Sequence, residues 1–65
     1  MAQRTSIDAQ EARRKFLGAS IERLAVVYIG VTARTYSTWI KDGATAKNIE
    51  RIERALKDYA KKEAY

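Results

Sequence analysis

The chain contains no cysteine, no histidine and no proline, and only three of its 65 residues are glycine. Without cysteine it forms no disulfides, and without cysteine or histidine it cannot build the common soft-ligand zinc sites, so we expect no metal or cofactor. A chain of this length buries only about 60% of the surface that its unfolded form exposes. Oligomerisation remains as a source of extra stability, and we therefore expect a homodimer.

Long apolar runs are also missing. The longest, Leu24 to Val31, covers roughly eight residues, far below the ~20 needed to cross a bilayer. The first six residues, Met-Ala-Gln-Arg-Thr-Ser, lack the apolar segment of a secretory signal. These absences predict a soluble protein of the cytoplasm.

Groups that carry out catalysis are scarce as well. Histidine and cysteine are absent, there is no glycine-rich phosphate loop, and no pair of carboxylates is free of a lysine or arginine four residues on. General acid–base chemistry and phosphate transfer both need such groups. We therefore expect no enzymatic activity.

Positive charge is in excess. Thirteen Lys and Arg residues against eight Asp and Glu give a formal charge of +5, which attracts polyanions. Several cations have an acidic residue four positions earlier, which is typical of a solvated helix surface. These pairs are Glu11–Lys15, Glu50–Arg54, Glu53–Lys57 and Asp58–Lys62. The cations left uncompensated are Arg4, Arg13, Arg14, Arg23, Arg34, Lys41, Lys47, Arg51 and Lys61.

Glycines at positions 18, 30 and 43 divide the chain into four segments, and each segment is predicted to be a helix. The first helix begins at Thr5 or Ser6, either of which can cap it, and Ala9, Ala12 and Phe16 fall on one of its faces. The second follows a cap at Ser20. A buried stripe at the spacing i, i+3, i+4 and i+7 is formed in it by Ile21, Leu24, Ala25 and Tyr28.

The third helix follows a cap at Thr32 and ends at Gly43, which we expect in a left-handed conformation. Tyr36 and Trp39 could stack on single-stranded bases, but their spacing places them on the inward side with Ile40. We therefore expect all three in the core. The fourth helix runs from about Ala46 to Lys62, with an apolar side made of Ile49, Ile52, Leu56 and Tyr59.

The segment from Ile21 to Gly43 carries the strongest functional signal. Two short helices separated by about three residues must cross steeply, as they do in a helix-turn-helix. Ala25 is small where the helices approach, and Gly30 suits a turn that would strain other residues. The leading edge of the later helix is then left in solvent, with Ala33, Arg34, Ser37, Thr38 and Lys41 on it.

Three stretches in this order, GASIERLAVVYIGVT, GVTARTYSTWIKDG and NIERIERAL, resemble the phage Cro and lambda-repressor-like family of helix-turn-helix proteins. They are similar to that family's second helix and turn, its third helix, and its following helix. The resemblance implies one compact, all-α, four-helix DNA-binding domain over residues 1–65. It also implies a sequence-specific transcriptional regulator, such as a repressor, of bacteriophage or bacterial origin that binds double-stranded DNA as a homodimer.

The resemblance also implies roles for individual residues. Ala33, Arg34, Ser37 and Thr38 face bases, and Thr32 and Lys41 lie nearest to phosphates. At the start of the second helix the family often has a neutral polar residue on a phosphate. This chain has Glu22 there, so we expect Ser20 or Arg23 to take over that contact.

Chemistry ranks these candidates. The guanidinium of Arg34 matches guanine O6 and N7 in a bidentate pair, with a plain phosphate contact as the alternative. The hydroxyls of Ser37 and Thr38 either meet bases or stay solvated. Lys47 and Asn48 either hold a phosphate at the start of the fourth helix or belong to a solvated loop.

Two other functions remain open. One is a protein-binding module, such as an antitoxin or anti-repressor domain, whose basic helix meets an acidic partner. The other is a basic amphipathic helix, residues 46–62, lying on a membrane. For the dimer surface the sequence offers Val27, or an apolar edge with Tyr59 and Tyr65.

Overall fold

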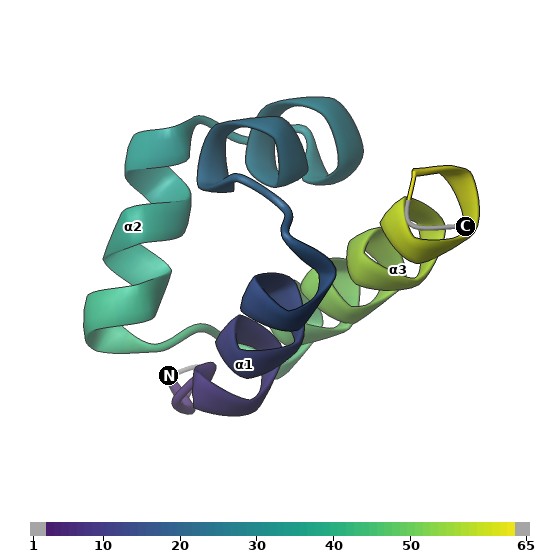
Figure 1. Ribbon diagram of the computed structural model, residues 1–65. Helices are drawn as coiled ribbons and strands as arrows, with labels where there is room; N and C mark the ends of the chain where they lie inside the picture. Colours follow the sequence, from purple (N-terminus) through teal and green to yellow (C-terminus); the bar gives the residue numbers. More distant parts are fainter. Residues whose placement is uncertain (1–2, 64–65) are drawn as a thin grey trace.

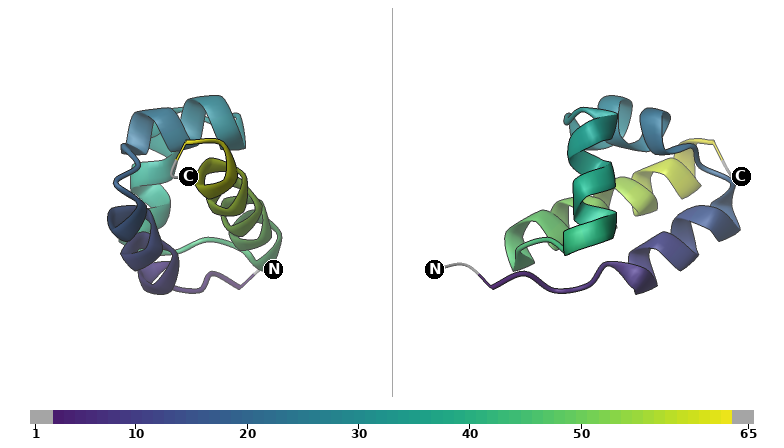
Figure 2. Two further views of the ribbon diagram at one scale, coloured as in Figure 1. Left: turned by 45° about the vertical axis from the view of Figure 1, so that its right-hand side comes forward. Right: turned by 90° about the vertical axis from the view of Figure 1, so that its left-hand side faces the viewer.

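The computed structural model describes residues 3–63, which are helical apart from short connections and form no β-strand (Figure 1). The expected all-α class is confirmed. The elements are α1 (Asp8–Leu17), the π-helix η1 (Arg23–Ile29), α2 (Ala33–Asp42) and α3 (Ala46–Lys62). α3 packs against both α1 and η1, and α2 stands at one end of the molecule, steeply inclined to η1 (Figures 1 and 2).

Hydroxyl caps set the start of three helices. Ser20 Oγ accepts the backbone N–H of Arg23 at 3.1 Å, and Thr32 Oγ1 accepts that of Thr35 at 3.1 Å. Thr45 caps α3 through the N–H of Asn48, at 3.4 Å. The predicted caps at Ser20 and Thr32 are therefore confirmed, as is the span predicted for the fourth helix.

The first helix begins later than predicted, at Asp8 instead of directly after Thr5 or Ser6. Thr5 forms an antiparallel bridge with Ala44, its N–H and C=O each hydrogen-bonded to Ala44 at 2.9 Å, and this pairing holds it extended. Ser6 Oγ still accepts the N–H of Asp8 at 3.2 Å. Ile7, between bridge and helix, is buried.

The second helix has the predicted buried stripe but a wider turn than predicted. Leu24 and Ala25 are fully buried, and η1 is π-helical, with backbone bonds between residues five apart, as from Gly30 N–H to Ala25 O at 2.7 Å. Gly30 ends it in the left-handed conformation, with φ +89°, as expected. The wide turn leaves Val26 and Val27 both more than half exposed.

The core confirms the inward position of the aromatic residues of α2. It consists of Ile7, Ala19, Leu24, Ala25, Tyr36, Trp39, Ala44, Ile52, Ala55, Leu56 and Tyr59. Tyr36 and Trp39 meet edge to face, with ring centroids 6.1 Å apart. Tyr59 packs on Tyr28 and is buried, so it offers no edge to a second subunit, and Tyr65 lies outside the described residues.

α1 does not turn to the core the face that its apolar residues suggest. Ala9, Ala12 and Phe16 do share a face, but this face lies in solvent, and Phe16 is 87% exposed. The inner face instead carries Glu11, which is buried, and Arg14. A polar network between these two residues and α2 takes the place of apolar packing.

The loop between α2 and α3 depends on Gly43. Its φ is +86°, as expected of a helix end, but its ψ of 175° is extended instead of left-handed, which sends the chain toward the bridge with Thr5. A Cβ atom at this position would lie 2.7 Å from the backbone oxygen of Thr5. Gly18 also has a positive φ, but no atom would come within 4 Å of its Cβ.

These two glycines give a matched test of the bridge. Gly43→Ala should destabilise the fold by more than about 2 kcal/mol, because backbone strain adds to a collision with another backbone segment. Gly18→Ala should cost only about 1 kcal/mol, for the strain alone. Urea denaturation of both variants measures the difference, and equal losses would mean that the bridge at Thr5 contributes nothing.

Candidate nucleic-acid interface

The outer face of α2, which we define as Arg34, Ser37, Thr38 and Lys41, is exposed as the sequence predicts. Ala33, which was also expected in solvent, is partly buried, because it sits where α2 meets the turn. Tyr36 and Trp39 hold the helix from behind, and residues 30–32 connect it to η1. The outer face therefore stands at one edge of the molecule, free of the other helices (Figure 1).

The polar groups of this face differ in how free they are. Within residues 3–63, the side chains of Arg34, Ser37 and Lys41 form no hydrogen bond, and no acidic group lies within 4 Å of either cation. Thr38 Oγ1 donates to the backbone oxygen of Arg34 at 3.1 Å. Its hydroxyl therefore keeps only acceptor capacity for a ligand, beside an exposed methyl group.

The amino end of α2 has its own polarity. Thr32 Oγ1 is engaged with the backbone N–H of Thr35 and, at 2.9 Å, with the hydroxyl of Thr35. The backbone N–H groups of Ala33 and Arg34 are left without helical acceptors, and the first turn contains no acidic residue. The positive end of the helix dipole is therefore open to an anion, while the Thr32 side chain is occupied.

Arg23, a candidate for a phosphate contact, is exposed but paired with an acidic residue of the same chain. Its Nε donates to both oxygens of Glu63 at 2.8 Å, and Tyr28 donates its hydroxyl to the same carboxylate. The hydrogen bonds from Tyr28 and Arg23 lower the pKa of Glu63, and the carboxylate in turn raises the pKa of Tyr28. Arg23 is thus not the uncompensated cation that the sequence suggested.

The other candidates for phosphate contacts near helix starts are Ser20, Lys47 and Asn48. Ser20 is exposed, but its hydroxyl serves the cap of the second helix. Lys47 is exposed in the first turn of α3, and the Asn48 carbonyl accepts from Arg51 at 3.4 Å. Arg51 also donates to the backbone oxygen of Ile29 at 3.2 Å, which ties α3 to the end of η1.

A buried ion pair behind α2 was missed by the sequence analysis. Arg14 holds Glu11 with two bonds, Nε to Oε2 at 2.6 Å and Nη2 to Oε1 at 2.9 Å, and the Tyr36 hydroxyl donates to Oε2 at 2.8 Å. Arg14 also reaches the backbone oxygen of Ala19 at 2.7 Å. This network, rather than the predicted surface pair with Lys15, fixes Glu11 and joins α1 to α2.

The titration of the network follows from its contacts. Burial alone would raise the pKa of Glu11, but the hydrogen bonds from Arg14 and Tyr36 outweigh it and lower the pKa below its usual 4.5. Burial and the Glu11 carboxylate both raise the pKa of Tyr36, which stays a hydroxyl donor. Glu11 is therefore ionised at neutral pH.

Most of the predicted surface pairs do not form. Of the four pairs expected at i,i+4 spacing, only Glu50–Arg54 comes within 4 Å in the described part of the chain, at 3.8 Å. Glu53 accepts instead from the Gln10 side chain at 3.2 Å, across from α3 to α1. Since these side chains are long and solvated, such pairs contribute little to stability.

Comparison with known protein families, with curated proteins and with solved structures finds no match to this chain. Within residues 3–63, none of the helices combines the length and the apolarity that a bilayer crossing requires. The case for a function therefore rests on the geometry of α2 and its surroundings.

The lowered pKa of Glu11 predicts a pH dependence. A carboxylate with a depressed pKa stabilises the fold above its unfolded value near 4.5, and this contribution is lost as pH falls through the lower folded pKa. Glu11→Gln should cost about 1–3 kcal/mol at pH 7, because Arg14 loses its partner. The gap to the unmodified chain should narrow as the pH is lowered from neutral to below 4.5.

Denaturation across this pH range measures both effects. Glu50→Gln is the matched control, since Glu50 and Arg54 are both about three-quarters exposed, and it should change stability by less than about 0.5 kcal/mol. A gap between Glu11→Gln and the unmodified chain that stayed constant down to pH 3 would show that the carboxylate does not couple to folding.

Proposed function

We propose that this chain is a sequence-specific DNA-binding protein in which η1 and α2 act as a helix-turn-helix and α2 enters the major groove of double-stranded DNA. The observation that supports this most is the outer face of α2, which is polar, cationic and uncovered. Two buried aromatic residues, Tyr36 and Trp39, hold the helix rigidly from behind. A rigid helix with a free polar edge is what base recognition in the major groove needs.

Dimensions and charge agree with this proposal. α2 has ten residues, so it is about 15 Å long, and the major groove is about 12 Å wide. Its amino end offers free N–H groups without an acidic neighbour, which suits the approach of a phosphate. The net charge of +5 adds a general attraction to the duplex.

The residues of the outer face take different roles. Arg34 lies in the first turn of α2 without a side-chain partner in the described part of the chain, and it reads guanine through its two-pronged guanidinium. Thr38 accepts a hydrogen bond or packs its methyl group on thymine, Ser37 meets a neighbouring base edge, and Ala33 gives the helix room to approach. Lys41, at the far end, contacts the phosphate backbone.

The phosphate contacts at helix starts fall to groups that remain free. The N–H groups of Ala33 and Arg34 replace the engaged hydroxyl of Thr32, and Lys47 with Asn48 supplies a second contact at the start of α3. Ser20 Oγ accepts the capping hydrogen bond but keeps its own O–H, which donates to a phosphate where Glu22 would repel one. Arg23 is bound to Glu63 and takes no part in this contact.

As a biological role we propose a transcriptional regulator of the phage or bacterial Cro and repressor type, acting as a homodimer. Two α2 helices then lie about 34–36 Å apart, one turn of DNA, on a site with twofold symmetry. Val26 and Val27, more than half exposed on η1, favour a second candidate, a protein-binding module such as an antitoxin or anti-repressor domain.

Selection from random duplexes, followed by salt titration on the recovered sequence, tests the proposal. We expect a palindrome. For three or four Lys or Arg contacts per subunit, affinity should fall by about 10³ to 10⁵ between roughly 50 and 200 mM salt. No enriched sequence, or an affinity that does not respond to salt, would favour the protein-binding module.

Two substitutions separate base reading from phosphate contact. Arg34→Ala should relax the preference at one base pair in each half-site, because about 1–3 kcal/mol of discrimination is lost. Lys41→Ala should weaken binding to all sequences alike and reduce the salt slope by about one per subunit. Binding curves on the selected site and on single-base variants distinguish them, and identical behaviour of both variants would refute this division of roles.

A further inference from the structure

The outer side of α1 carries an apolar strip that no other element of residues 3–63 covers. Ala9, Ala12 and Phe16 are all exposed, and Phe16 is 87% exposed. They recur at i, i+3 and i+7, so they line up along one side of the helix. Within residues 3–63 the Phe16 ring has almost no packing role, which is unusual for a large aromatic side chain.

Charges of opposite sign stand beside the two ends of the strip. Asp8 stands at the amino end and Lys15 at the carboxyl end, and both are exposed. Neither forms an ion pair within residues 3–63. Because they are seven residues apart, they lie on the same edge of the helix, about two turns from each other.

We propose that a second copy of this chain covers the strip, with the two α1 helices antiparallel about a twofold axis. Phe16 of one copy rests on Ala9 and Ala12 of the other, where the small side chains leave room for the ring. Asp8 of each copy lies beside Lys15 of the other, and the two helix dipoles oppose each other. This deepens the dimeric binding mode proposed above and rests on it only for the role of DNA.

A second copy fits the strip better than an unrelated partner because the strip is self-complementary. A twofold interface uses the same patch on both subunits, so every projection must meet a recess and every charge its opposite. The strip has one ring at one end and two alanines toward the other, with opposite charges beside them. The exposed valines of η1 lack this property, since Glu22 lies at one end and the neutral residues Gly30 and Val31 at the other.

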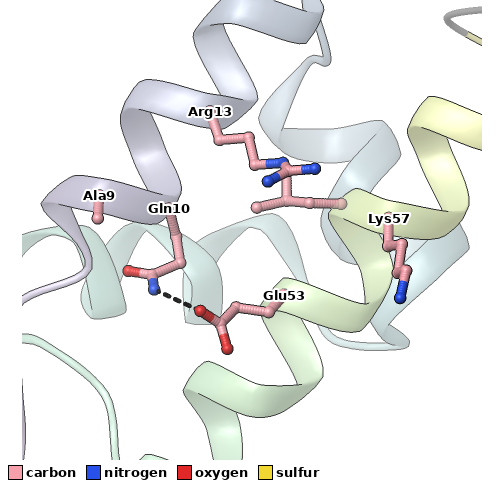
Figure 3. Close-up of a pocket in the computed structure, with 6 residues that line it drawn as sticks. Ala9, Gln10, Arg13, Glu53 and Lys57 are labelled. Carbon is pink, nitrogen blue, oxygen red and sulfur yellow. Dashed lines mark hydrogen bonds between the residues drawn. The ribbon is translucent and has the colours of Figure 1, made fainter.

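Pairing through α1 leaves the outer face of α2 free. Figures 1 and 2 show α1 and α2 at different edges of the molecule, so that a copy placed on α1 does not cover α2. Arg13, the other exposed cation near the strip, extends from α1 toward α3 over a groove beside Gln10 and Glu53 (Figure 3). Its charge therefore points away from the seam between the two helices.

The size of the seam sets its strength. Each α1 has ten residues and is about 15 Å long, so the contact is smaller than the ~1,200 Å² that stable complexes bury. Free association is therefore weak. Binding to two adjacent half-sites raises the effective concentration of one subunit near the other and completes the dimer on DNA.

Sedimentation equilibrium of the whole chain without DNA, from about 10 µM to about 1 mM, tests the interface in the range expected for so small a contact. We expect a monomer–dimer equilibrium. Asp8→Lys and Lys15→Asp should each raise the dissociation constant on the order of tenfold at low salt, because each places like charges opposite each other. An equal mixture of the two variants should associate as well as the unmodified chain, since the mixed dimer restores both attractive pairs.

Substitution of the ring gives a second test with a matched control. Phe16→Ala should raise the dissociation constant about tenfold or more without lowering the melting temperature, because the ring packs on almost nothing inside one chain. Val27→Ala, which trims an equally uncovered side chain on η1, should leave association unchanged. A chain that stays monomeric at about 1 mM, a mixture that fails to associate, or a loss with Val27→Ala but not with Phe16→Ala each overturns the proposal.

DNA binding separates this inference from the proposed function. Phe16→Ala should keep the affinity for a single half-site and lose affinity only for the two-half-site palindrome. If the unmodified chain associates through α1 but binds no duplex, the proposed function fails while the interface stands. If it binds half-sites but Phe16→Ala does not change palindrome binding, the interface fails while DNA binding stands.

Discussion

The charged contact between Glu11 and Arg14 holds the arrangement of helices together. Its carboxylate accepts from Arg14 on its own helix and from Tyr36 on α2, and Arg14 reaches on to Ala19 ahead of η1. Three segments thus meet at one ion pair. In a core this small, a buried carboxylate that lost its partners would be expensive, so the network admits few alternative positions of α2. The outer face of α2 is therefore oriented from behind by a polar contact in addition to apolar packing.

Much of the fold could be predicted from local patterns. α3 has a clean 3.6-residue repeat and a polar residue before its first turn, and it begins and ends as predicted. The inward aromatic residues of α2 and the turn at Gly30 follow from the same kind of signal. The first helix was predicted, but its inner face could not be, because that face is set by the contact of Glu11 with Tyr36, 25 residues later. The π-helical form of η1 could not be predicted either, because an apolar pattern of only two turns fits a π-helix as well as an α-helix.

In the candidate site, too, some features were predictable from the sequence and others were not. Exposure of Arg34, Ser37, Thr38 and Lys41 follows from the inward position of their neighbours and was predictable. The caps at Ser20 and Thr32 were predicted, but spacing alone could not show that capping would occupy the hydroxyls that were also candidates for phosphate contacts. The ion pair of Arg23 was not predicted. The hydroxyls of Ser20 and Thr32 cap helices, and Arg23 is paired with Glu63, 40 residues away. A local sequence pattern does not show which distant residue a side chain will contact.

The wide turn of η1 has a consequence for how the gene can vary. A π-helical stretch contains one residue more than an α-helix needs to join the same two ends. A deletion of one residue between Ser20 and Gly30 would therefore be absorbed if the segment tightened into an α-helix that kept both of its ends in place. Elsewhere in a helix such a deletion rotates everything beyond it. In this chain the extra residue lies directly before α2, the helix whose orientation matters most for the proposed function.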